Sequence, residues 1–217
     1  ILRLNKEKAE RYGYQEHVYD ALLDQFEPFM KTAEVQSVFA SLRDALVGLV
    51  ERIKERPQVD DAFLQRPFSE EGQKTLGREL LEQLNYEFSR GRLDVSAHPF
   101  TTTLGPNDVR ITTRYHEDHF ASSIFSTIHE AGHALYELGV DPQYHNTLIA
   151  TGTSLGIHES QSRLWENVIG RSRAFWKHWY PRVRSLYPEQ LSGVDEHAFY
   201  RAINKVEPSY IRIEADE

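Results

Sequence analysis

The sequence contains no cysteine among its 217 residues, and this absence excludes a whole group of chemistries. Disulfide bonds, thiolate metal sites and a cysteine nucleophile are all ruled out. Any metal site must therefore use histidine, aspartate or glutamate side chains. No apolar run approaches the roughly 20 residues that a membrane-spanning helix needs, and no signal peptide opens the chain. We therefore expect a cytoplasmic protein without a membrane partner.

Positive charge is also scarce in this chain. It has 25 lysine and arginine residues against 33 aspartate and glutamate residues, which gives a formal net charge of −8. Surfaces that bind nucleic acid or anionic membranes need a basic face, so nucleic acid is not an expected partner. Hydrophobic residues make up 40% of the chain and aromatic residues 12%. This content is enough for a packed core and predicts a folded chain rather than a disordered one.

Apolar residues recur at helical spacing along most of the chain and predict a mainly α-helical fold. The predicted helices cover residues 5–26, 35–55, 69–88, 121–138, 157–179 and 195–206. Between them, residues 93–115 are rich in threonine and valine and contain the turn sequence Gly-Pro-Asn-Asp at 105–108. This segment predicts a small β-hairpin or sheet, with residues 108–115 as one strand. No repeat or low-complexity linker divides the chain, so we expect a single domain.

The segment Thr127–Gly139, TIHEAGHALYELG, carries the strongest functional signal. Residues four apart lie on one face of a helix, so His129 and His133 can direct two imidazoles at one point. Glu130 lies about 100° round the helix, where it reaches a metal-bound water more easily than the metal. This is the logic of the H-E-x-x-H motif, in which the metal acidifies a water and the glutamate takes its proton. The alternative is a helix with two half-buried histidines that bind nothing.

A third ligand would distinguish these alternatives, because a catalytic zinc usually has three protein ligands and one open position. The candidates after the helix are His145, His158, Glu159 and Glu166. Glu159 is favoured because it begins the next predicted helix, which can return antiparallel to the first. His158 is interpreted as a residue that lines the pocket or contacts one of the metal-ligating side chains. Glu166 either orients a ligating histidine or is an ordinary solvated glutamate.

Five short motifs in order make the chain similar to one known family. They are HPF at 98–100, D-x-R-x-T at 108–112, HEAGH at 129–133, HESQ at 158–161 and I-R-x-x-A-D at 211–216. Together they resemble the thermostable (Taq-type) carboxypeptidases, the metallopeptidase family M32. They span roughly the second half of the chain, and the helices before residue 93 carry no motif. The resemblance implies a zincin-like helical metallopeptidase that releases single residues from the C-termini of peptides.

The resemblance also implies roles for particular residues. The implied metal ligands are His129, His133 and Glu159. Glu130 would be the general base and later the proton donor. Arg110 and Arg212 would hold the terminal carboxylate of the substrate, which a guanidinium can bind through two hydrogen bonds. His98 of the HPF motif would be a further substrate-binding residue.

Family members are more than twice as long and carry a further G-x-x-Q-D-x-H-W motif, which is absent here. We therefore expect residues 1–217 to be a helical catalytic-domain fragment, truncated at both ends relative to the family. Zinc is the expected cofactor, although cobalt and manganese suit the same ligands. The resemblance allows a homodimer. Two alternatives remain: a metalloendopeptidase with the same metal site, and an inactive fragment that serves as a structural or dimerisation domain.

Overall fold

The computed structural model of the chain describes residues 1–208, which form two compact units. The first unit contains Ile1–Gln58 together with Thr153–Ile157, and the second contains Val59–Gly152 together with the residues from 158 onward. Arg212 lies outside the described residues. Within residues 1–208, every helix is too short or too polar to cross a membrane.

The first unit begins with three helices, of which the first is shorter than predicted. The helices are α1 (Leu2–Tyr12), α2 (Asp20–Leu23) and α3 (Thr32–Lys54). The prediction of one helix over residues 5–26 was wrong, because Gly13 adopts a φ of 78°, which ends α1 after Tyr12. The Asp20 carboxylate accepts hydrogen bonds from the backbone N–H and the hydroxyl of Thr32, at 2.8 and 2.5 Å, where α3 begins. The predicted helix over residues 35–55 is confirmed by α3.

The second unit is helical around a small sheet. Its helices are α4 (Glu70–Gln83), α5 (Phe120–Leu138), α6 (Leu155–Arg163, from residue 158), α7 (Arg173–Leu186) and α8 (Glu196–Ile203). A π-helical segment, Leu164–Gly170, continues α6, and short 3-10 turns lie at Ala62–Gln65, Phe88–Arg90 and Pro142–Tyr144. The mainly α-helical fold with a small sheet is therefore confirmed.

Three strands form the sheet: β1 (Leu93–Val95), β2 (Thr101–Gly105) and β3 (Asp108–Thr113). Their order is β1-β3-β2, with β1 parallel and β2 antiparallel to β3. The predicted hairpin is confirmed by β2 and β3, which are joined by the turn that follows Gly105. Thr101 near the start of β2 pairs with Ile111 of β3. β2 is an edge strand. Val109 and Ile111 of β3 are fully buried in one cluster with Ala131 and Ala134 of α5.

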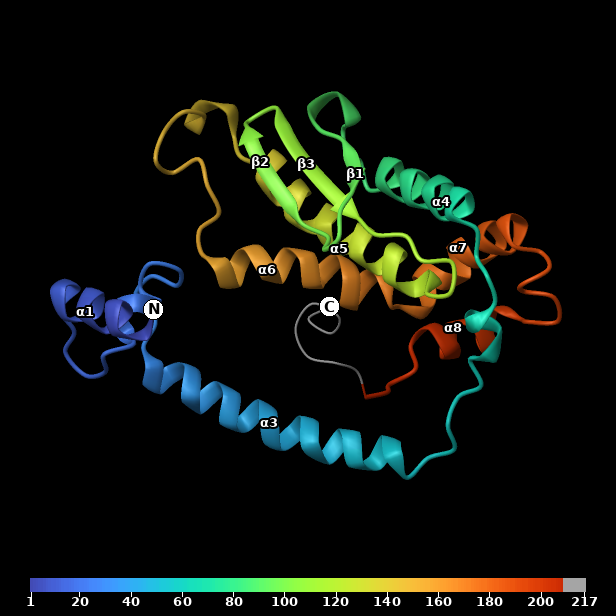
Figure 1. The fold of residues 1–217 in the computed structure, drawn as a ribbon, viewed down its shortest axis with the longest axis horizontal. Helices are drawn as coiled ribbons and strands as arrows, with labels where there is room; N and C mark the ends of the chain where they lie inside the picture. The colour runs from blue at the N-terminus through green and yellow to red at the C-terminus, as the bar shows by residue number, and fades with distance from the viewer. Residues whose placement is uncertain (209–217) are drawn as a thin grey trace. The chain divides into compact units, whose positions relative to one another are not determined.

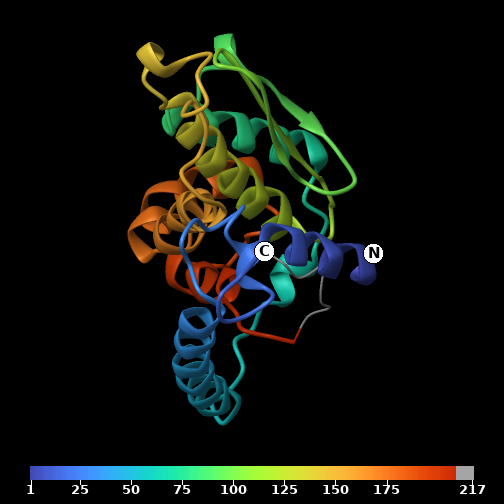
Figure 2. The same ribbon diagram turned by 90° about the vertical axis from the view of Figure 1, so that its left-hand side faces the viewer.

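Helix α5 is the centre of the second unit. The sheet lies along one side of α5, and the part of α6 from residue 158 onward, with the segment that follows it, lies on another (Figure 1; Figure 2). Twelve of its residues are buried, so almost every face of the helix is covered. Its first half joins a large aromatic core, whose buried members include Phe68, Leu76, Phe120, Ile124, Ile128, Trp176, Val183 and Phe199. This packing holds the HEAGH turns of α5 rigidly inside the unit.

The predicted helix over residues 157–179 is interrupted in the structure. The chain leaves helical geometry after Gly170, and the Ser172 side chain caps the new helix α7 by accepting from the backbone N–H of Phe175. Gly170 is packed so closely that a Cβ there would lie 3.0 Å from the carbonyl oxygen of Trp165. The periodicity of apolar residues continues through this break, which is why the sequence pattern predicted one helix.

Gly132 allows α5 and α6 to approach closely beside the HEAGH motif. A Cβ at Gly132 would lie 2.6 Å from Cα of Ser162 and 2.8 Å from the carbonyl oxygen of Gln161. Both are backbone atoms, so neither can turn aside as a side chain would. At Gly77 in α4, by contrast, the nearest atom to an added Cβ is the Thr127 methyl at 3.8 Å.

We expect Gly132→Ala to lower the melting temperature of the chain, measured by circular dichroism. Overpacking costs about 1–3 kcal/mol, and a clash with backbone atoms at 2.6 and 2.8 Å belongs to the upper part of that range. It therefore outweighs the gain of about 1 kcal/mol from replacing glycine by alanine inside a helix. Gly77→Ala is the matched control, because the same propensity gain comes there without a clash, and its melting temperature should be equal to or above that of the parent. A Gly132→Ala protein as stable as the control would show that the two helices do not depend on this contact.

Candidate metal centre

Helices α5 and α6 bring the three predicted metal ligands together. His129 and His133 lie one turn apart on α5, with ring centroids separated by 5.0 Å. From α6, the Oε2 atom of Glu159 lies 3.3 Å from Nε2 of His133 and 3.8 Å from Nε2 of His129. One donor atom from each residue lies within 4.8 Å of the other two. His145 is not part of this group.

The chemistry of these donors fits a divalent metal ion. Two imidazole nitrogens and one carboxylate oxygen form a ligand set that zinc accepts, and three protein ligands leave a position open for a reactant. The second oxygen of Glu159, Oε1, accepts a hydrogen bond of 2.8 Å from Nε of Arg163. That contact fixes the carboxylate and leaves Oε2 directed at the two histidines.

Glu166 supports His129 from the side away from Glu159. Its Oε2 lies 3.0 Å from Nδ1 of His129, and its side chain is fully buried. Arg163 and Arg171 donate to the same carboxylate at 3.2 and 3.1 Å. Burial raises the pKa of Glu166, but the hydrogen bonds from His129 and Arg171 outweigh it, so this pKa lies below its usual value. The sequence left open whether Glu166 orients a ligating histidine or is a solvated glutamate. In the structure it is buried and contacts Nδ1 of His129.

The two histidines of α5 differ in their affinity for protons. Burial lowers the pKa of His129, but the hydrogen bond with Glu166 and the charges of Glu130, Glu159 and Glu166 reverse this effect and raise it above 6.5. Burial also lowers the pKa of His133, and the neighbouring His129 and His158 lower it further, to about 4.

Glu130 is buried beside the two histidines and bound to the sheet. Only 4% of its surface is exposed. The hydroxyl of Thr101, on the edge strand β2, donates to Oε2 of Glu130 at 2.5 Å and lies 3.0 Å from the carbonyl oxygen of the same residue. The sequence analysis gave Thr101 no role. The available signal was its position directly after the HPF motif.

A cavity of about 490 Å³ opens over this cluster. Its walls include His98, Phe100 and Thr101 from the segment that leads into β2, together with Glu130 and the three candidate ligands. The predicted substrate-binding residue His98 therefore faces the same cavity as the candidate ligands. This space is large enough for part of a peptide and lies beside the edge of the sheet.

Arg110 does not line this cavity. It lies on β3 between the buried residues Val109 and Ile111, so its side chain leaves the opposite face of the strand. Its guanidinium donates two hydrogen bonds to the Asp108 carboxylate, at 2.7 and 2.8 Å. This pairing, chiefly the hydrogen bonding, holds the pKa of Asp108 below its usual value. The structure thus gives Arg110 a carboxylate partner within the chain.

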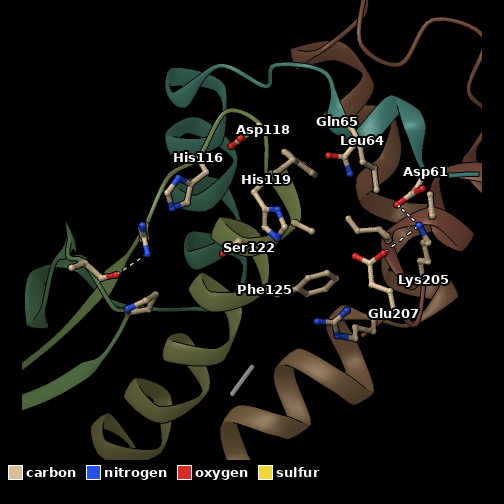
Figure 3. Close-up of a pocket in the computed structure, with 18 residues that line it drawn as sticks. Asp61, Leu64, Gln65, His116, Asp118, His119, Ser122, Phe125, Lys205 and Glu207 are labelled. Atoms are coloured by element: carbon tan, nitrogen blue, oxygen red, sulfur yellow. Dashed lines mark hydrogen bonds and ion pairs between the residues drawn. The ribbon is translucent and has the colours of Figure 1, made fainter. Parts of the chain in front are cut away.

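A second pocket, of about 480 Å³, lies beside the first turns of α5, and none of the predicted site residues that the structure describes lines it. Figure 3 shows His116 and His119 on one side of it and Lys205 on the other. Lys205 forms ion pairs with Asp61 at 2.9 Å and with Glu207 at 3.2 Å. The charge of Lys205 is therefore neutralised within the pocket wall.

Known proteins of high similarity have the same fold. The chain is 46% identical over 232 aligned residues to Thermostable carboxypeptidase 1 of Thermus thermophilus and 44% identical over 218 residues to Carboxypeptidase 1 of Bacillus subtilis. Each match covers 100% of this chain and 44% of the relative. A crystal structure of an M32 carboxypeptidase from Deinococcus radiodurans superposes with a TM-score of 0.93 at 44% identity, covering 96% of this chain and 42% of that chain.

A helix carrying H-E-x-x-H, with a carboxylate from the next helix beside it, is the arrangement of a metallopeptidase centre. The chain belongs to one family of this class: the family model described as Carboxypeptidase Taq (M32) metallopeptidase matches residues 1–217. The resemblance seen in the five sequence motifs is thereby confirmed. The chain spans about 44% of the length of the curated relatives it matches.

We expect His129 to take up its proton at a higher pH than His133 when chelator-treated protein is acidified from pH 8. The pKa of His129 lies above 6.5 and that of His133 near 4, so His133 should stay neutral at pH 5 while His129 is largely charged. Long-range ¹H–¹⁵N NMR spectra of the imidazoles report each titration directly. The reverse order, or a single shared midpoint, would contradict the charge balance described here.

Proposed function

We propose that this chain carries the catalytic centre of a metallocarboxypeptidase, with His129, His133 and Glu159 as the metal ligands. The observation that carries the proposal is the convergence of these three donors in one cavity. Zinc is the metal best suited to two imidazoles and one carboxylate, and cobalt or manganese suit the same set. The named activity of the 44–46% identical relatives supports the reaction class.

A divalent ion bound there supplies Lewis acidity, which polarises a peptide carbonyl and makes water more acidic. Glu130 is the proposed general base, because its carboxylate lies buried in the wall of the same cavity. It takes a proton from the attacking water and returns it to the leaving amine. Thr101 holds this carboxylate from β2, so the base is fixed before substrate arrives. General base catalysis of this kind contributes about 10²–10⁴-fold to the rate.

A carboxypeptidase must also recognise the free carboxylate at the end of its substrate. His98 is proposed to contact the substrate, since it lines the cavity with the cluster. Arg110 and Arg212 remain the proposed carboxylate-binding residues on the strength of the D-x-R-x-T and I-R-x-x-A-D motifs. Arg110 would have to exchange or share its two hydrogen bonds with Asp108 to do so. Peptides with a free C-terminus are the proposed substrates, and a homodimer and a cytoplasmic location stay predictions.

We expect Glu130→Gln to lower kcat by about 10²–10⁴-fold because the amide cannot accept the proton. Zinc affinity should stay within a few-fold of the parent, since Glu130 is not a proposed ligand. Peptide hydrolysis and zinc titration, both on the purified chain, measure the two quantities. Glu189→Gln, which makes the same change at an exposed residue, is the matched control. Parent-like turnover in Glu130→Gln would remove Glu130 from the base role.

Two peptides of one sequence, one with a free C-terminal carboxylate and one amidated, distinguish the proposed function from its rivals. With zinc present we expect release of a single residue from the free peptide only, and none after treatment with a chelator. Mass spectrometry of the products measures both. Cleavage of both peptides would favour a metalloendopeptidase. Intact peptides in the presence of bound zinc would leave the family membership standing and show that this chain alone does not complete the chemistry. Weak or absent zinc binding would favour a purely structural or dimerisation role.

A further inference from the structure

His133, His158 and Glu137 form a hydrogen-bonded series of side chains. The series begins at the ring nitrogen of His133 that does not face Glu159. Nδ1 of His133 lies 2.6 Å from Nδ1 of His158, and Nε2 of His158 lies 2.7 Å from Oε1 of Glu137. The side chains are 16%, 22% and 14% exposed in the order His133, His158, Glu137. These contacts are as short as strong hydrogen bonds and are largely shielded from water.

The direction of both hydrogen bonds in this series follows from its last member, Glu137. A carboxylate only accepts, so Nε2 of His158 must carry a proton and donate it to Glu137. A neutral imidazole that donates from Nε2 can only accept at Nδ1. The 2.6 Å contact therefore requires the donor to be Nδ1–H of His133. With its proton on Nδ1, His133 keeps a lone pair on Nε2, the atom that lies 3.3 Å from Glu159.

We infer that Glu137 and His158 are positioning residues, which fix His133 in the Nδ1–H tautomer and direct the lone pair of Nε2 toward Glu159. The inference rests on the metal centre proposed above and assigns the side chains that support its second histidine. A ligand histidine commonly donates its other ring N–H to an oxygen or nitrogen acceptor, which sets both tautomer and ring orientation. Here the acceptor is another imidazole, itself held by a carboxylate.

Packing fixes His158 in the orientation that this role needs. Its ring lies 4.7 Å from that of His133 at an interplanar angle of 32°, and the Tyr136 ring meets it edge-on at 5.3 Å. On another side is Gly152, where a Cβ would come within 2.9 Å of Cδ2 of His158. Glu137 lies one turn after His133 on α5, so the helix itself places the carboxylate on the same face.

The two histidines of α5 are thus supported in different ways. Nδ1 of His129 meets the carboxylate of Glu166 directly at 3.0 Å, whereas Nδ1 of His133 reaches a carboxylate only through His158. A change in Glu137 or His158 should therefore alter the tautomer of His133 and leave that of His129 unchanged. His129 is an internal control in the same molecule.

Glu137→Gln tests the inference with almost no change in volume. An amide can donate as well as accept, so it permits the opposite direction of both hydrogen bonds, in which His158 donates to His133. His133 should then populate the Nε2–H tautomer, seen as exchanged ¹⁵N shifts of its two ring nitrogens in the chelator-treated protein. Zinc affinity, measured by competition with a chromophoric chelator, should fall about 10–100-fold. His158→Ala should weaken zinc binding by a similar factor, and His178→Ala, at an exposed histidine, is the control for losing an imidazole.

A parent-like tautomer of His133 in Glu137→Gln, together with parent-like zinc affinity, would overturn the inference. Thermal unfolding of each variant shows whether the fold is intact, and Glu137→Gln decides the matter where His158→Ala does not fold. Failure of the parent chain to bind zinc would refute the proposed metal centre instead. In that event the tautomers of the chelator-treated protein still show whether Glu137 and His158 hold His133.

Discussion

The close contact between α5 and α6 at Gly132 is the constraint on which the centre depends. With no Cβ at that position, the backbone of Gln161 and Ser162 comes to within 3 Å of where one would stand. That approach brings Glu159, which lies on α6 three residues before Ser162, to the imidazoles of α5. Side-chain ligands reach only a few ångströms from their backbones, so a small widening of the helix pair would separate the donors. Stability and ligand geometry therefore depend on the same glycine.

Charge around the cluster is arranged so that each histidine keeps a defined role. Glu130, Glu137, Glu159 and Glu166 lie close to the imidazoles, and Arg163 and Arg171 neutralise part of this charge through Glu159 and Glu166. The remaining negative charge favours a cation over an anion at this position. Two of these carboxylates also orient the imidazoles: Glu166 contacts Nδ1 of His129 directly, and Glu137 acts on His133 through His158.

Much of this centre was predictable from the sequence because its spacing is local. His129 and His133 are one helical turn apart, and Glu159 begins the next helix, so periodicity and connection length were enough to group them. The turn at residues 105–108 likewise predicted the hairpin of β2 and β3. Glu137 continues the spacing of the two histidines by one more turn, and that signal was present but unused.

Other features depend on contacts that no local pattern encodes. At the interruption before α7, a Cβ on Gly170 would lie 3.3 Å from the side chain of Ile128 on α5. Arg110, a predicted substrate-binding residue, donates its hydrogen bonds to Asp108 in the structure. Thr101 acquires importance only when β2 comes to lie beside Glu130. Each requires knowledge of which surfaces meet.

The order of the site residues along the chain has a consequence for how the centre forms during folding. Glu130, the three candidate ligands and their supporting carboxylates all fall between residues 129 and 166. The entropy lost when a connecting loop closes grows only with the logarithm of its length, about 0.6 kcal/mol for each doubling. A centre built from neighbouring helices therefore needs little long-range search, and short-range contacts of this kind are associated with rapid folding. The connection between α5 and α6 can vary in length at small cost while the donors keep their places.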